Sequence, residues 1–128
     1  MKKEDSVALE EQQIGARRRS EVEREHRDLD AVGAAPHRQT QFVRGALTGY
    51  VWALGHADAA PITGLREKGV PSTQGITAEV DATLVQLASQ PLRTVPRDYV
   101  QGVHDALAWV CGFQDEPPGV TEQAPTGE

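Results

Sequence analysis

Histidine and aspartate side chains recur at two places where they could bind a metal ion. His56 lies two residues before Asp58, and His104 is followed directly by Asp105 and later by Asp115. Imidazole and carboxylate groups are common ligands of divalent metals, and a bound ion could activate a water molecule. A metal-assisted enzyme would use four of these side chains: His56, Asp58, His104 and Asp115. The competing interpretation is that they are ordinary surface residues and that the chain holds no cofactor.

Asp58 and Asp115 also occupy matching positions, each a few residues beyond a predicted helix end. A carboxylate there faces the negative end of the helix dipole, which is mildly unfavourable. Either each aspartate shapes a turn through its side chain, or the two form a pair that binds a cation or a basic partner. No general acid or base stands beside them in the sequence to assist catalysis.

Arg17, Arg18 and Arg19 form the strongest basic cluster and the best candidate for contact with an anion. Acidic residues follow at helical spacing, so pairs such as Arg17 with Glu21 would neutralise the cluster on a solvated helix face. The whole chain has 13 basic and 19 acidic residues and a net charge of −6. This balance argues against broad binding to nucleic acid.

Cys111 is the only cysteine of the chain. It falls on the apolar stripe of a predicted helix, where a buried and inert thiol is the simplest interpretation. One cysteine cannot form an internal disulfide, which suits a reducing compartment. The sequence has no run of 18 apolar residues and no apolar segment behind Lys2 and Lys3, so we expect a cytoplasmic protein without membrane contact.

The six aromatic residues fall in two windows that resemble each other. FVRGALTGYVWALGHADAAP, residues 42–61, aligns without a gap with YVQGVHDALAWVCGFQDEPP, residues 99–118, and six of the twenty positions are identical. This match predicts an internal duplication, whose aromatic residues anchor either the core or an interface between chains. The candidate interface residues are Trp52, Trp109, Tyr50 and Phe113.

Both windows have the features of a helix that ends at a glycine. Apolar residues recur at spacings of three and four, and Gly55 and Gly112 stand where a left-handed residue terminates a helix. Gly45 and Gly102 lie inside the same helices, where glycine costs about 1 kcal/mol relative to alanine. We expect two helices to approach closely at these glycines, which would offset that cost.

The segment before the second window is also predicted to be helical. Thr77 is a suitable N-cap residue. Val80, Leu84, Leu87 and Ala88 then follow at helical spacing and form an apolar stripe.

The segment before the first window is highly charged. Ser20 and Glu23 have the spacing of a capping box. Apolar residues are sparse and mostly about seven apart, which is typical of a thin coiled-coil seam. Residues 5–32 could therefore form one long helix, frayed near Gly15, that projects from the core or pairs with a partner.

Together these patterns predict an all-α fold of two pseudo-repeated helical hairpins, a four-helix arrangement with a charged N-terminal helical extension. The predicted boundaries are 1–19 for the charged helical or frayed extension, 20–61 for the first hairpin, 62–75 for a linker, 76–118 for the second hairpin and 119–128 for a disordered acidic tail.

The predicted core is small, and its helices carry apolar rows on both sides, which favours homo-oligomerisation. We predict a non-enzymatic helical assembly or interaction protein that acts through protein–protein contacts. The alternative is a small regulator that binds nucleic acid or a basic protein. The segment YVQGVHDALAWVCG is similar to helices in small phage and actinobacterial proteins of uncharacterised role, and this resemblance implies a phage or mobile-element origin.

Overall fold

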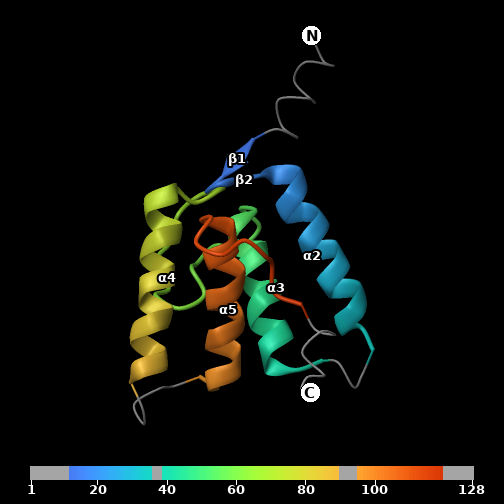
Figure 1. The fold of residues 1–128 in the computed structure, drawn as a ribbon. Coiled ribbons are helices and arrows are strands. Elements are labelled where there is room, and N and C mark those ends of the chain that lie inside the picture. Colours follow the sequence, from blue (N-terminus) through green and yellow to red (C-terminus); the bar gives the residue numbers. More distant parts are fainter. Residues whose placement is uncertain (1–11, 36–38, 90–94, 120–128) are drawn as a thin grey trace.

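Four helices make up most of the computed structural model, which describes residues 12–35, 39–89 and 95–119. They are α2 (Arg19–Gly33), α3 (Gln41–Ala53), α4 (Thr73–Ala88) and α5 (Arg97–Val110). A two-stranded antiparallel β-hairpin, β1 (Gln13–Ile14) with β2 (Arg17–Arg18), precedes them. The chain is therefore mainly helical, as predicted, with one short hairpin in addition (Figure 1).

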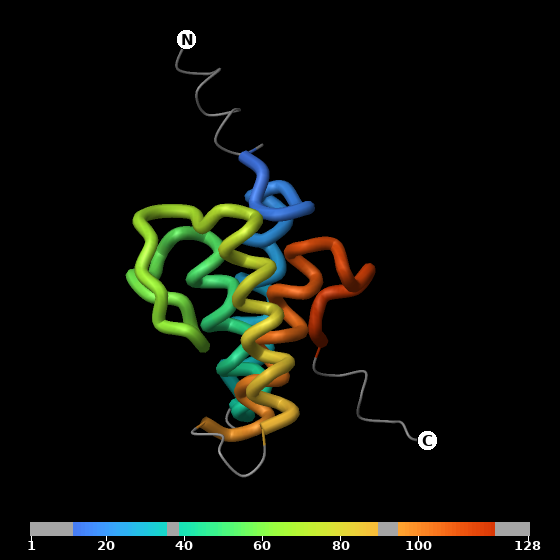
Figure 2. The backbone as a smooth tube through the Cα atoms, turned by 90° about the vertical axis from the view of Figure 1, so that its left-hand side faces the viewer, coloured from blue at the N-terminus to red at the C-terminus, as the bar shows by residue number. Residues whose placement is uncertain are grey.

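The helices α3 and α5 form the centre of the molecule and run side by side in the same direction (Figure 1). The helix α2 flanks α3, the helix α4 flanks α5, and both outer helices run the opposite way. Figure 2 shows the same arrangement from the side, with the long connection between α3 and α4 at one edge.

The contact between α3 and α5 is made at two glycines and is reciprocal. Gly45 lies against the backbone of Tyr99, and Gly102 lies against the backbone of Phe42. A Cβ atom on either glycine would come closer than 3.0 Å to a carbonyl group of the other helix. The predicted close approach at these glycines is confirmed, and the tight packing offsets the low helix propensity of glycine.

The two central helices also end in the same way. Gly55 and Gly112 have φ angles of 85° and 84°, in the left-handed region that favours glycine. After α3, the His56 amide donates to the Val51 carbonyl oxygen, and after α5 the Phe113 amide donates to the Ala108 oxygen. Both ends are therefore Schellman motifs, and the predicted stop at each glycine is confirmed.

The N-terminal region differs from the long helix predicted over residues 5–32. Residues 13–18 form the β-hairpin, because Gly15 turns the chain with a φ of 61°. The helix α2 begins only at Arg19, and the Arg18 amide donates to the Glu21 carboxylate in place of the predicted cap at Ser20. Residues 1–11 lie outside the described residues, as does all but the first residue of the predicted tail 119–128.

The connection between α3 and α4 covers residues 54–72, so it begins before the predicted linker of residues 62–75 and ends within it. The helix α4 begins at Thr73, and its N-cap is Ser72 rather than Thr77. Glu79 of α4 is buried, and its carboxylate accepts hydrogen bonds from the Ile62 amide, the Thr63 amide and the Thr63 hydroxyl. This carboxylate fixes the connection against α4.

Candidate functional site

The paired tryptophans lie inside a single chain. Trp52 and Trp109 are only 3% and 5% exposed, and Tyr50 is fully buried. The rings of Tyr50 and Trp109 meet edge to face, with centroids 6.2 Å apart. Of the four candidate interface residues, only Phe113 is exposed, at 60% of its surface.

The buried Tyr50 hydroxyl has no hydrogen-bond partner within residues 12–35, 39–89 and 95–119. Burial raises the pKa of Tyr50 well above its ordinary value, the negative charges of Glu25 and Asp105 raise it further, and Arg17 acts in the opposite direction. A phenol that stays neutral and unpaired at physiological pH is a packing group and not a proton donor to solvent.

The β-hairpin caps the C-terminal end of α5. The Ala16 amide donates to the Val110 oxygen at 2.7 Å. The Arg17 guanidinium donates to the carbonyl oxygens of Trp109 and Gln114 at 2.7 and 2.8 Å and lies 4.5 Å from the Trp109 ring centroid. A cation at the C-terminal end of a helix satisfies free carbonyls and opposes the negative dipole end. Arg17 is therefore occupied within the fold.

The other two arginines of the cluster lie differently. Arg19 forms an ion pair with Glu23 at 2.9 Å and donates to the Gln12 side chain, whereas Arg18 is exposed. The predicted pairing of Arg17 with Glu21 is not formed, because Arg17 turns towards α5 and Glu21 accepts from the Arg18 amide. Arg18 is the cluster member whose side chain is left to solvent.

The four residues of the metal hypothesis do not gather into one site. Asp58 lines a groove of about 530 Å³ beside the α3–α4 connection, and His56 lines another groove of about 370 Å³ with His26 of α2. His104 instead contacts its neighbour Asp105, and Asp115 is exposed beyond α5. Within residues 12–35, 39–89 and 95–119, no group of three or more potential ligands is arranged to hold a metal ion.

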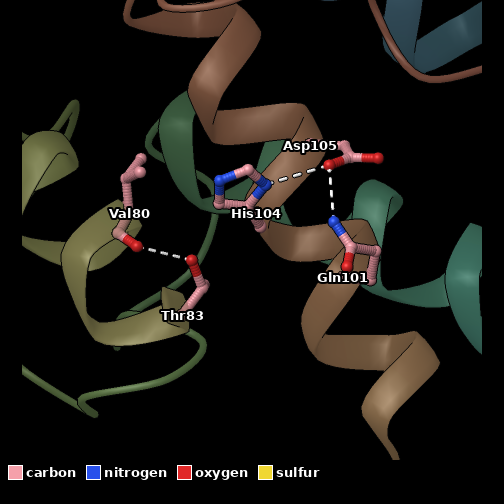
Figure 3. Close-up of polar contacts among 5 residues, drawn as sticks. All are labelled: Val80, Thr83, Gln101, His104 and Asp105. Atoms are coloured by element: carbon pink, nitrogen blue, oxygen red, sulfur yellow. Dashed lines mark hydrogen bonds and ion pairs between the residues drawn. The ribbon is translucent and has the colours of Figure 1, made fainter. Parts of the chain in front are cut away.

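His104 and Gln101 both bind the same carboxylate oxygen of Asp105. The His104 Nδ1 and the Gln101 Nε2 atoms are each 2.9 Å from Asp105 Oδ1 (Figure 3). The Asp105 side chain is 25% exposed, and no described residue forms a hydrogen bond with its second oxygen. These contacts hold Asp105 in place and leave one carboxylate oxygen available.

Cys111 is partly buried at the end of α5, 3.8 Å from the Thr77 hydroxyl. Burial raises the pKa of its thiol, and the contact with Thr77 only partly opposes that shift. A thiol with a raised pKa is a weak nucleophile at neutral pH. The geometry therefore agrees with a structural cysteine.

The outer face of α4 carries exposed apolar side chains, among them Leu84 of the predicted apolar stripe. Leu84 and Val85 are 50% and 65% exposed. The residues that α4 buries are Ile76, Glu79, Val80 and Thr83. The helix is rotated in this way because Glu79 must face inward to bind the α3–α4 connection.

The orientation of α4 could not be predicted from hydropathy, because two of the residues that it buries are polar. Glu79 is satisfied by the connection, and the Thr83 hydroxyl donates to the Val80 oxygen of its own helix (Figure 3). A hydrogen-bonded polar side chain can be buried at little cost. One sequence feature does indicate an exposed apolar face: α4 has apolar residues on all sides, which is unusual for a helix at the surface.

Comparison with known proteins does not assign a function. The chain matches no family model, no curated protein and no solved structure. Across its described residues, every helix is too short or too polar to cross a lipid bilayer.

Proposed function

We propose that this chain is a non-enzymatic interaction protein that self-associates through the outer face of α4. The observation that carries this proposal is the exposure of Leu84 and Val85 side by side on one helix. Their neighbours Ala78 and Ala88 are also exposed and small, so another helix could approach closely. Asp81 is the one charged residue among the exposed positions of α4.

The other outer helix has a different surface, which supports the choice of α4. The exposed positions of α2 include four charged residues: Arg24, Arg27, Asp28 and Asp30. Charged residues are depleted in the centre of protein interfaces, and apolar residues are tolerated there. Of the two outer helices, α4 is therefore the better docking surface.

A two-fold contact would bury Leu84 and Val85 of both copies. Full burial of such side chains contributes about 1.5–3 kcal/mol each, so half-exposed residues contribute roughly 1 kcal/mol each. Four such residues give about 4 kcal/mol, which corresponds to a dissociation constant of about 1 mM before the cost of association is included. The dimer is therefore weak, and we expect it to form only towards millimolar concentrations.

Light scattering of the full chain at concentrations rising from the micromolar to the millimolar range tests this function. The mass should rise above the 13.9 kDa of one chain as concentration increases. The substitution Val85→Lys should return it to one chain, because a lysine at the centre of the contact would be desolvated.

Leu65→Lys is the matched control. Leu65 is also exposed, but it lies in the α3–α4 connection and not on α4. At each concentration the Leu65→Lys variant should show the same mass by light scattering as the wild-type chain. A wild-type chain of 13.9 kDa throughout, or equal effects of both substitutions, would refute self-association through α4.

The same proposal includes a tandem origin of the two hairpins, residues 20–61 and 76–118. The reciprocal contacts of Gly45 and Gly102 support it, as do the matching helix ends at Gly55 and Gly112. The α2–α3 pair and the α4–α5 pair would then be two copies of one unit. The exposed α4 surface is the place where the second copy has diverged from the first.

A further inference from the structure

An open groove of about 570 Å³ lies between the start of α3 and the face of α5. Thr40, Phe42 and Val43 line it from α3 and its N-cap, and Pro118 and Gly119 line it from the segment after α5. Two carboxylates, Asp98 and Asp105, complete the lining. The groove therefore combines apolar walls with negative charge.

The described residues that line this groove include no basic residue. Among the described residues, Asp98 forms no ion pair, and Asp105 has His104 and Gln101 as polar partners, both at its Oδ1 atom. Asp105 Oδ2 and both oxygens of Asp98 can accept hydrogen bonds from a bound group. A cation with an aliphatic stem, such as arginine or lysine, suits both the carboxylates and the apolar walls.

The distance between the two carboxylates determines how far apart two basic residues of a bound segment should lie. Asp98 and Asp105 are seven residues apart on one helix, which places them about 10.5 Å apart along its axis. In an extended polyproline II segment, residues three apart lie on the same side and about 9 Å apart. A basic pair with two residues between its members therefore matches the two carboxylates.

We infer that this groove binds an extended segment of a partner protein that carries two basic residues three positions apart. One basic side chain pairs with Asp98 and the other with Asp105, and the residues between them lie against Phe42 and Pro118. The segment after α5 does not supply this ligand, because residues 114–128 contain four acidic residues and no basic residue. Binding through this groove does not require α4 to self-associate.

Fluorescence anisotropy with labelled peptides tests the inference on the full chain. The probe is a peptide with the core Arg-Pro-Pro-Arg, and the spacing control has the core Arg-Pro-Arg. The first peptide should bind more tightly, and added salt should weaken it because the contacts are charged. Asp98→Asn and Asp105→Asn should each weaken binding about two- to five-fold, as expected for partly exposed ion pairs.

Control variants with the same change in charge distinguish binding in the groove from nonspecific attraction of a basic peptide to an acidic protein. Asp28→Asn and Asp30→Asn remove the same charge from the exposed surface of α2 and should leave binding unchanged. Asp98 is exposed, so its variant should retain the wild-type circular dichroism spectrum. The inference is overturned if the peptide does not bind, if both spacings bind equally, or if the Asp98→Asn and Asp28→Asn variants bind alike.

Discussion

Replacing Gly45 by alanine tests the close contact between α3 and α5. A Cβ atom at this position would lie 2.8 Å from the Tyr99 carbonyl carbon and closer still to its oxygen. Ordinary contacts of a Cβ atom begin at about 3.4 Å. Because the obstacle is backbone and not a flexible side chain, the two helices must separate to admit the methyl group.

The expected cost follows from two opposing effects. Overpacking of a well-packed core costs about 1–3 kcal/mol, and a contact with rigid backbone belongs at the upper end. Alanine in place of a mid-helix glycine returns about 1 kcal/mol of helix propensity. We therefore expect Gly45→Ala to lower the free energy of unfolding by about 2 kcal/mol, and Gly102→Ala, which faces the Phe42 backbone, to have a similar effect.

Chemical denaturation followed by circular dichroism measures this difference. Gly49→Ala is the matched control, since it lies one turn further along α3 and its Cβ atom would meet Ala106 and Leu107 at 3.4 to 3.6 Å. That variant should be as stable as the wild type or up to about 1 kcal/mol more stable. If Gly45→Ala were as stable as Gly49→Ala, the close glycine contact would not exist in solution.

Two further substitutions test the buried polar groups, with stability measured in the same way. Tyr50→Phe removes a buried hydroxyl that has no hydrogen-bond partner in the described part of the chain and should raise the free energy of unfolding by about 1 kcal/mol. Burial raises the pKa of Tyr50, so the wild type should lose stability as the pH rises above about 10, and the variant should lose less. If the free energy of unfolding of both proteins fell equally with rising pH, this expectation would be wrong. Glu79→Gln keeps the shape of the side chain but replaces one carboxylate oxygen by an NH2 group. That group is a donor and cannot accept the hydrogen bonds that Ile62 and Thr63 donate. The substitution should lower the free energy of unfolding by about 2–3 kcal/mol, and an unchanged midpoint would show that the carboxylate does not fix the connection.

The central helices could be predicted from the sequence because their signals are local. A glycine with a positive φ ends both α3 and α5, and the positions of Gly55 and Gly112 were visible in the sequence. The close packing of Gly45 and Gly102 was also predictable, since a mid-helix glycine without a packing role would only destabilise the helix.

The surfaces could not be predicted, because they depend on contacts between distant residues. Arg17 was expected on a solvated helix but instead caps α5, more than ninety residues away in the chain. Leu84 belongs to the predicted apolar stripe of its helix but is exposed, because Glu79 takes an inward position. A hydropathy pattern treats a charged residue as exposed and cannot reveal that a distant connection will satisfy it.

The sequence by itself determined where the central helices end and where they meet. Helix termination and close approach are properties of single residues, above all of glycine, which lacks a side chain. The tertiary structure alone decided which side of α4 faces solvent and that the two tryptophans lie inside one chain. It also placed Asp98 and Asp105 in one groove with Phe42. Burial and juxtaposition are set by the partners that folding brings together, and no local pattern contains that information.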